Sequence, residues 1–348
     1  MIEIQMMLEM RLPRDGEVSH DQYYECGLRL AEIADEIPLT AILLNEHHGS
    51  PDGYLSSPFV FGAAIAARTT KIRIMVPIMP SLHAPVEMAE HAVTLDLISK
   101  GRIDLLTLVG YRPEEFEMND VSLADRASRT DEGLQVLRGA FSGNPFQWRG
   151  KEILVSPRPA QPQGPPIWVG GAVPASARRA ARFGDGFYPT VPNEELFQIY
   201  REECQRIGKG SGAVWHNPLA PLAIFVSDDV ERTWEDIGEP CIHALNTYAE
   251  WAAAGSGESP MTMSMDVNQL RGSGIVQVLT PDETLRLAEE KERAGNYLSL
   301  HPLFGGIHPD VALRSMELFA DKVVPRLDVR PPKAVERNDP ASRSQIPA

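Results

Sequence analysis

A run of polar and ionisable residues directly follows an apolar stretch near the start of the chain. Residues 41–44 read Ala-Ile-Leu-Leu, and Asn45, Glu46, His47 and His48 come next. An imidazole has an ordinary pKa of about 6.5, so it can donate and accept protons near neutrality. Adjacent residues of an extended chain point to opposite sides, so His47 and His48 are not expected to share one centre, and no metal site is predicted. The alternative is a histidine that is only hydrogen-bonded in place.

A second candidate is a glycine pair before a helical segment. Gly170 and Gly171 end an apolar run, and Ser176 lies near the start of the helix that follows. Glycine lets the backbone approach a phosphate group, and the amino end of a helix favours negative charge. The alternative is an ordinary turn in which Ser176 only caps the helix.

Short apolar runs that alternate with helical segments must position these residues. This alternation predicts βα units, and eight of them favour a closed (β/α)8 barrel with insertion loops. An open doubly wound sheet is the alternative, but no GxGxxG motif follows the first run. The predicted strands are 2–8, 41–45, 72–76, 103–109, 167–170, 186–190, 222–226 and 297–301. The predicted helices are 22–37, 85–99, 128–141, 174–183, 194–207, 230–251, 281–293 and 309–323.

The pattern predicts one barrel domain over residues 1–327 and a polar tail over 328–348 outside the core. Five prolines between residues 157 and 166 predict an extended connector within an insertion. Residues 252–274 are rich in small residues and show no clear period, so we expect a mobile lid there. A connector without a catalytic role is the alternative.

Composition excludes several classes of protein. The chain has 348 residues and a formal net charge of −15, which disfavours nucleic acid as a partner. Cys26, Cys204 and Cys241 are widely spaced and predict neither a disulfide framework nor a thiolate metal site. No stretch has the apolar length of a membrane span, and no export signal is recognised, so we expect a cytoplasmic protein without a membrane partner.

Several segments in order give the chain a resemblance to the bacterial luciferase family. Glu46-His47-His48 is similar to the family's signature at the end of the second strand. The other matching segments are 53–60, 70–75, 83–86, 95–102, 110–116, 167–171, 180–186, 302–306 and 315–319. Each segment alone is unspecific, but their number and order cover nearly the whole chain. The resemblance implies a barrel that binds flavin mononucleotide (FMN), or the deazaflavin coenzyme F-420, at the carboxyl ends of its strands.

The resemblance also implies roles for single residues. His47 matches the family's acid/base near the flavin, and His48 would support the pocket. Glu46 would contact flavin or be a solvated carboxylate at the barrel rim. The bond between Val76 and Pro77 matches an unusual cis peptide behind the flavin ring. The remaining residues assigned to cofactor binding are Thr107, Val109, Gly110, Gly170, Gly171, Ala172 and Ser176.

The chain departs from the luciferase pattern at the cofactor's phosphate. Val109 stands at the position of the family's phosphate-binding arginine, and Ala172 and Val173 replace acidic and serine residues. Arg112 can supply the missing guanidinium or be a surface residue. This departure weakens any expectation of light emission and leaves the deazaflavin alternative open.

The resemblance implies a monooxygenase that uses reduced FMN and molecular oxygen to oxygenate a small organic substrate. A separate flavin reductase would supply the reduced FMN, and a homodimer or heterodimer is expected. One alternative is hydride transfer with the deazaflavin coenzyme, which needs no oxygen. Another is a non-catalytic partner subunit. Aldehyde, ketone, aromatic and alkane-like substrates all stay open, because pocket loops vary without altering the barrel.

Overall fold

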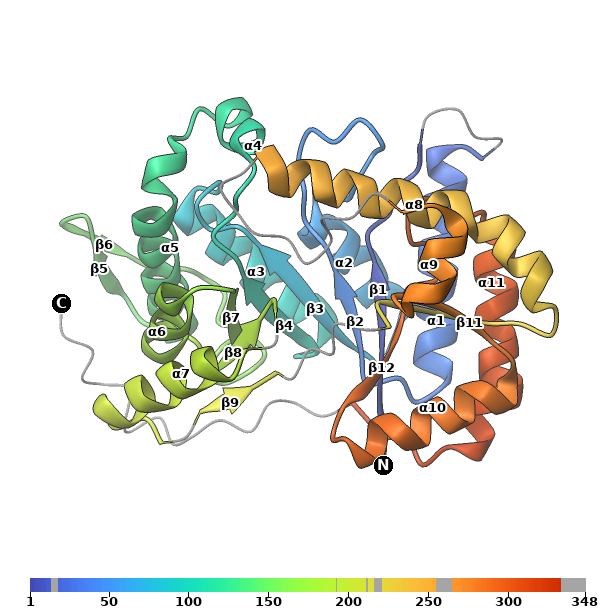
Figure 1. The fold of residues 1–348 in the computed structure, drawn as a ribbon. Coiled ribbons are helices and arrows are strands. Elements are labelled where there is room, and N and C mark those ends of the chain that lie inside the picture. Colours follow the sequence, from blue (N-terminus) through green and yellow to red (C-terminus); the bar gives the residue numbers. More distant parts are fainter. Residues whose placement is uncertain (14–17, 192, 211, 216–220, 255–264, 333–348) are drawn as a thin grey trace. The chain divides into compact units, whose positions relative to one another are not determined.

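The computed structural model describes the chain except for residues 14–17, 192, 211, 216–220, 255–264 and 333–348. The chain forms two compact units. Figure 1 labels the helices and strands named below. The first unit comprises Met1–Ile74, Tyr111–Met118 and Pro218–Lys333, and the second comprises Met75–Gly110 and Asn119–Asn217. Strand β3 (Arg73–Ile78) continues from the first unit into the second.

The first unit contains parallel strands in the order β12-β1-β2. Gln5 pairs with Ser299 on one side and with Ala41 on the other, and Leu8 pairs with Leu44. A second parallel pair joins β10 to β11. The strands are β1 (Glu3–Leu8), β2 (Ala41–Leu44), β10 (Ala223–Val226), β11 (Val276–Leu279) and β12 (Tyr297–Leu300). The helices are α1 (His20–Glu36), α2 (Pro58–Arg68), α4 (Pro113–Met118), α8 (Val230–Ala254), α9 (Val267–Ser273), α10 (Pro281–Arg293) and α11 (Pro309–Leu318), followed by a π-helical turn (Phe319–Val323) and a 3-10 turn (Val324–Arg326).

The second unit contains parallel strands in the order β4-β7-β8-β9 and an antiparallel hairpin, β5-β6. Leu105 pairs with Ile167, and Gly186 pairs with Trp168 and Ala213. The strands are β4 (Ile103–Thr107), β5 (Phe146–Trp148), β6 (Lys151–Ile153), β7 (Ile167–Gly171), β8 (Gly186–Pro189) and β9 (Ala213–Val214). The helices are α3 (Pro85–Ser99), α5 (Arg126–Phe141), α6 (Pro174–Phe183) and α7 (Glu194–Arg206), with a 3-10 turn (Leu123–Asp125).

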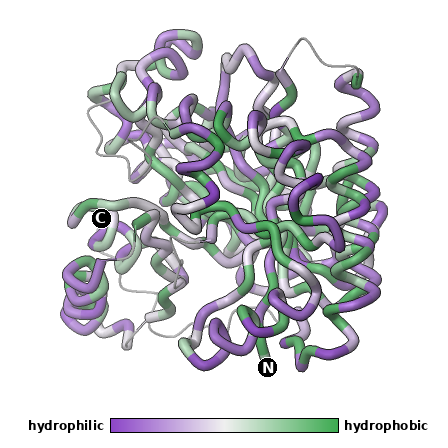
Figure 2. Tube along the Cα trace, turned by 45° about the vertical axis from the view of Figure 1, so that its right-hand side comes forward, coloured by the Kyte–Doolittle hydropathy of each residue, from purple (hydrophilic) through white to green (hydrophobic). Residues whose placement is uncertain are grey.

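Local sequence explains where several helices begin. Pro85, Pro174, Pro281 and Pro309 each occupy the first turn of a helix, where the missing N–H costs nothing and the fixed φ fits. Thr280 and the side chain of Glu283 also cap α10 reciprocally. Hydrophobic and hydrophilic segments alternate along the helices, as expected of helices with one buried face (Figure 2). No helix among the described residues is both long and apolar enough to cross a bilayer.

All eight predicted strands are present, and the predicted cis peptide is wrong. Val76 and Pro77 lie inside β3, and the peptide bond between them is trans. A cis bond shortens the distance between neighbouring Cα atoms from about 3.8 Å to about 2.9 Å, which would interrupt this extended run. Among the described residues, the cis bond is Ser156-Pro157, within the proline-rich connector.

Two other segments differ from the sequence-based expectation. Helix α9 forms within the predicted lid, capped by Asp266, so the absence of regular structure was wrongly predicted for residues 267–273. Residues 255–264 lie outside the described part of the chain, and the lid stays a prediction. The first residues of the tail contact β1, because Ile2 donates to the carbonyl of Asp328 and accepts from Arg330. The rest of the tail, from residue 333, also lies outside the described residues.

Candidate active site

His47 follows β2 in the first unit and is paired with a buried carboxylate. Its Nδ1 lies 2.7 Å from Oε1 of Glu115, a fully buried residue on α4. The same oxygen accepts a hydrogen bond from the backbone N–H of His48 at 3.0 Å. One carboxylate therefore fixes both the imidazole of His47 and the backbone that carries it.

Arg112 lies one helical turn before Glu115 and completes this arrangement. Its Nη1 donates to the carbonyl oxygen of His48 at 3.0 Å and lies 3.3 Å from Oε1 of Glu115. The residue is 5% exposed, so the surface alternative for Arg112 is wrong. The guanidinium offsets the carboxylate's charge in a site that is shielded from water.

Four aromatic rings surround His47. The ring centroids of Trp251, Tyr54, Tyr111 and Tyr248 lie 4.6, 4.9, 5.9 and 6.4 Å from that of the imidazole. Tyr248 and Trp251 are three residues apart on α8 and so share one helix face. The side chain of His47 is only 13% exposed. Burial and the nearby Glu115 raise the pKa of Tyr111 to about 12, so its hydroxyl stays protonated near neutrality.

Arg11 is fully buried against three of the same aromatic groups. Its guanidinium carbon lies 4.7, 4.8 and 5.2 Å from the ring centroids of Tyr54, Tyr248 and Trp251. The guanidinium carbon of Arg112 lies 4.0 Å from the ring centroid of the same indole. Cations over aromatic faces are stabilising when both groups are removed from water.

Two carboxylates balance the charge of Arg11. Its Nε lies 3.3 Å from Oε1 of Glu9, and its Nη1 lies 3.1 Å from Oδ2 of Asp52. Burial would raise the pKa of Asp52, but a hydrogen bond with His243 and the charge of Arg11 outweigh burial and lower it to about 2. Asp52 is therefore ionised at any pH near neutrality.

Glu9 anchors a chain of hydrogen bonds. The hydroxyl of Tyr248 donates to Oε2 of Glu9 at 3.0 Å, and the hydroxyls of Tyr248 and Tyr54 lie 2.7 Å apart. The backbone N–H of Gly305 donates to Oε1 of Glu9 at 2.7 Å. Gly305 has a φ of +73°, and a Cβ there would lie 1.9 Å from the carbonyl oxygen of Pro240. Only glycine can therefore bring this backbone to Glu9.

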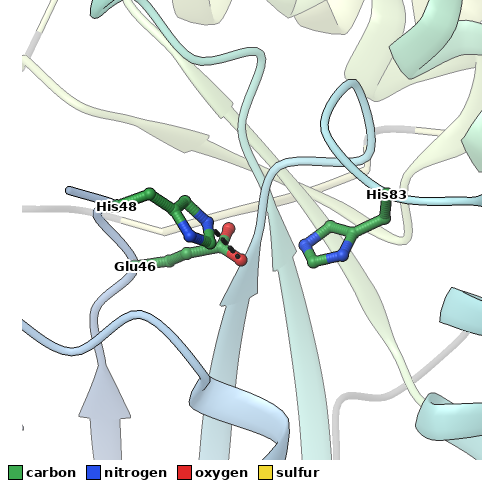
Figure 3. Close-up of side chains that lie close together, drawn as sticks. All are labelled: Glu46, His48 and His83. Carbon is green, nitrogen blue, oxygen red and sulfur yellow. Dashed lines mark ion pairs between the residues drawn. The ribbon is translucent and has the colours of Figure 1, made fainter. Parts of the chain in front are cut away.

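Glu46 and His48 form a separate ion pair beside this cluster (Figure 3). Oε1 of Glu46 lies 3.5 Å from Nε2 of His48. Burial would lower the pKa of His48, but the hydrogen bond and charge of Glu46 raise it. Glu46 is 7% exposed, so the alternative of a solvated rim carboxylate is wrong. His47 and His48 thus turn to different carboxylates, as adjacent extended residues should.

Residues 170–176 of the second unit form a turn, called here the glycine turn, whose backbone lies close to neighbouring side chains. Gly171 has a φ of +145°, and a Cβ there would lie 2.5 Å from the Cβ of Ser176. A Cβ on Gly170 would lie 2.5 Å from Cδ2 of Leu108. The hydroxyl of Ser176 donates to the carbonyl oxygen of Val173 at 2.6 Å and is buried. The same hydroxyl accepts a hydrogen bond from the backbone N–H of Val173 at 3.3 Å, so Ser176, at the third position of α6, holds the backbone at the start of that helix.

The other predicted cofactor residues of the second unit lie around β4 and after β7. The hydroxyl of Thr107 donates to the carbonyl oxygen of Trp168 at 3.1 Å. The carbonyl of Val109 accepts from the hydroxyl of Ser81 at 2.9 Å. Gly110 has a φ of +82°, which ends the run of β4. Ala172 is exposed two residues before the start of α6.

One family shares its sequence pattern with most of this chain: the luciferase-like monooxygenases match residues 7–299. The chain belongs to this family. An uncharacterized protein of Sinorhizobium fredii is 34% identical over 326 residues, covering 91% of this chain and 95% of that relative. The oxygenase component of a flavin-dependent trigonelline monooxygenase from Acinetobacter baylyi is 29% identical over 199 residues, covering 53% of this chain and 55% of that relative.

A solved structure extends the likeness to three dimensions. A monooxygenase from Streptomyces bottropensis has a TM-score of 0.73 with this chain at 26% identity, covering 93% of this chain and 99% of that chain. The predicted resemblance, the barrel fold class and the oxidoreductase class of a luciferase-like monooxygenase are thereby confirmed.

Within this luciferase-like monooxygenase, the sequence identified His47 but missed its partners. The unpredicted members of the cluster are Glu9, Arg11, Tyr54, Tyr111, Glu115, Tyr248 and Trp251. A usable signal existed for one of them. Arg112 and Glu115 are three residues apart, just after a strand end, and that spacing places both on one helix face.

Proposed function

We propose that this chain is a flavin-dependent monooxygenase that takes reduced FMN from a separate reductase and oxygenates a small organic substrate. Its family membership and the name of the relative from Acinetobacter baylyi, a flavin-dependent oxygenase component, support the general class. The pairing of His47 with Glu115 carries the proposal, because it equips the chain for proton transfer. When bound, reduced FMN would supply the electrons that activate oxygen.

The pairing of His47 with Glu115 defines which ring nitrogen exchanges protons. A carboxylate only accepts, so the contact at Nδ1 assigns a proton to that nitrogen. Nε2 then gives or takes the proton during the reaction. Glu115 stabilises the charged ring when Nε2 is protonated, and the guanidinium of Arg112, 3.3 Å from the same oxygen, helps to hold the side chain of Glu115 in place.

The aromatic rings around His47 would keep water away from the reacting groups. Trp251 and Tyr54 lie against the imidazole, which leaves 13% of the His47 side chain exposed. Exclusion of water strengthens every charge interaction within a site and prevents wasteful proton leakage.

The turn before α6 in the second unit is the proposed holder of the FMN phosphate. Gly171 leaves no side chain over the backbone, and the α6 amino end presents N–H groups and positive partial charge. Val109 and Ala172 supply no charge there, so backbone N–H groups, rather than an arginine, would bind the FMN phosphate.

Titration of the purified chain tests the proposal. Reduced FMN and reduced deazaflavin coenzyme would be titrated separately under nitrogen, and air would then be admitted. We expect tight binding of reduced FMN and oxygen-dependent reoxidation that differs from free FMN. Binding of the deazaflavin alone would replace the proposal with oxygen-independent hydride transfer, and binding of neither would support a non-catalytic subunit.

Substitution of Glu115 tests its part in proton transfer. For Glu115→Gln we expect reoxidation of bound FMN to change at least roughly tenfold while FMN affinity stays the same, because the charge beside Nδ1 is lost and the shape is kept. Glu114→Gln is the matched control, since Glu114 is exposed on the same helix. Equal rates in both variants would remove Glu115 from the mechanism. Partial recovery in Glu115→Asp would separate lost charge from lost packing.

A further inference from the structure

The second half of α8, residues 241–254, carries two of the rings that surround His47, and a partly exposed histidine attaches it to the segment after β2. We propose that His243 is a positioning residue for the His47 site: its contact with Asp52 holds this half of the helix so that Trp251 lies against His47. The inference rests on the proposed function, because it names a residue that places the groups around the proposed proton-transfer histidine.

A proline separates the second half of α8 from the first. Pro240 lies inside the helix, where it has no N–H to donate to the preceding turn, and such prolines are where helices bend. The first half has contacts of its own, since the guanidinium carbon of Arg271 on α9 lies 5.4 Å from the ring centroid of Trp234. A bend at Pro240 would move residues 241–254 and leave this contact in place. The position of the second half therefore depends on the contacts that it makes itself.

His243 makes a contact of the second half that is partly open to water. Its Nε2 lies 2.9 Å from Oδ2 of Asp52, and the two side chains are 39% and 5% exposed. Other groups hold Asp52 in place. Its backbone carbonyl accepts from the N–H of Leu12 at 2.7 Å, and its Oδ1 accepts from the hydroxyl of Ser50. His243 therefore joins the second half of α8 to a carboxylate whose position is fixed by other contacts.

The contact with His243 also affects the charge balance of the buried groups. Oδ2 of Asp52 lies 3.1 Å from Nη1 of Arg11, whose Nε lies 3.3 Å from Oε1 of Glu9. These three residues carry one net negative charge when all are ionised. A protonated His243 offsets that charge, and a neutral His243 can still donate a hydrogen bond from Nε2. His243 therefore suits Asp52 in either protonation state, and it binds more strongly when charged.

The side of α8 that carries His243 also carries the groups that lie against the His47 site. His243 and Trp251 are eight residues apart, a little more than two helical turns, so they lie on the same side of the helix. The ring centroid of Trp251 lies 4.6 Å from that of His47. Between them on the helix, the hydroxyl of Tyr248 donates to Glu9 at 3.0 Å. Replacement of His243 therefore tests the placement of α8 without removing any ring from the site.

Fluorine NMR on the full chain without flavin tests this placement. The five tryptophans are replaced by 5-fluorotryptophan, and the resonances of Trp251 and Trp234 are assigned by their phenylalanine variants. For His243→Leu we expect the Trp251 resonance to move, and its shift difference between H2O and D2O to increase at least twofold, because water reaches the ring. The resonance of Trp234, on the first half of α8, should stay where it is.

Further variants separate the contact from a general loss of structure. His243→Gln keeps a hydrogen-bond donor and should restore at least half of the Trp251 signal change. His243→Ala repeats the disruption with a smaller side chain, in case His243→Leu folds poorly by circular dichroism. His308→Leu is the matched control, because His308 is also partly exposed and lies 3.8 Å from a carboxylate, that of Asp310, at the start of α11.

Reoxidation of bound reduced FMN gives a second measurement. We expect its rate to change at least threefold in His243→Leu and to return toward the original rate in His243→Gln, because water would otherwise reach the proton-transfer site. Three outcomes would overturn the inference: an unmoved Trp251 resonance in both disruptive variants, an equal movement in His308→Leu, or no recovery in His243→Gln.

The fluorine experiment needs no flavin, so its failure is distinguishable from failure of the proposed function. Movement of Trp251 in a chain that does not bind reduced FMN would retain the placement of α8 by His243 and reject the monooxygenase. Binding of reduced FMN together with an unmoved Trp251 would do the reverse.

Discussion

The His47 cluster of the first unit and the glycine turn of the second unit differ in the groups that form them. The cluster is assembled from side chains of α4, α8 and the segments that follow β1 and β2. The turn consists of backbone within residues 170–176, and its one buried hydroxyl, on Ser176, is bound to Val173 nearby. This difference fits the proposed division of roles, in which the cluster transfers a proton and the turn holds a phosphate group.

The largest contrast is expected between His47→Ala and Ser176→Ala. Loss of the proposed proton-transfer group should lower turnover by about 10²–10⁴-fold while FMN affinity stays nearly unchanged. Ser176→Ala should lower the free energy of unfolding by about 1 kcal/mol through the loss of its hydrogen bonds with Val173 and leave proton transfer intact. FMN titration and reoxidation kinetics on both variants measure this. Turnover unchanged in His47→Ala would erase the distinction between the two regions.

The buried His301 should make the first unit sensitive to pH. Burial lowers its folded-state pKa to about 4, below an unfolded value of about 6.5. Between these values the unfolded chain binds more protons, so this group's contribution to stability falls as pH falls from about 6.5 to about 4, by about 3 kcal/mol in total. Denaturant unfolding across this range should show the slope, and His301→Phe should lose it. An identical slope in the variant would contradict the assignment to His301.

Gly171 tests whether the glycine turn needs the close contact with Ser176 or only a positive φ. The expected effect is smaller than the two above. Gly171→Ala places a Cβ 2.5 Å from that of Ser176, so we expect a loss of about 2 kcal/mol in the free energy of unfolding and weaker FMN binding. Gly150→Ala is the control, because Gly150 has a φ of +70° but nothing lies within 4 Å of its added Cβ. If the two variants lose equal stability and bind FMN alike, close approach plays no part.

Much of the fold followed from apolar periodicity. The predicted helices 85–99, 174–183 and 281–293 match α3, α6 and α10 to the residue, because a proline marks each start. Strands β5, β6, β9 and β11 and helices α4 and α9 were missed. All are short, and the composition of the segment before α9 and β11 suggested a loop. Short elements are fixed by pairing with distant strands such as β10, which local patterns do not contain.

The site was less predictable than the fold for a related reason. His47 stood out because ionisable residues end an apolar strand, but Glu115 is 68 residues away and is recognisable only from contacts. The burial of Glu46 and Arg112 was also hidden, since long charged side chains are exposed unless partners exist. The cis assignment at Val76-Pro77 failed because it came from family likeness and had no support in the local sequence.

The buried position of Arg11 has a consequence for how the first unit folds. Its two carboxylates and three aromatic neighbours come from both ends of the unit, and the bond from Tyr248 to Glu9 alone spans 239 residues. An unpaired buried charge is strongly unfavourable, so Arg11 can leave water only after these segments have met. Closure of such long loops is slow, so the side chain of Arg11 should stay in contact with water while the rest of the chain is synthesised. The first unit can therefore complete its folding around Arg11 only after α8 has been synthesised and has packed against it.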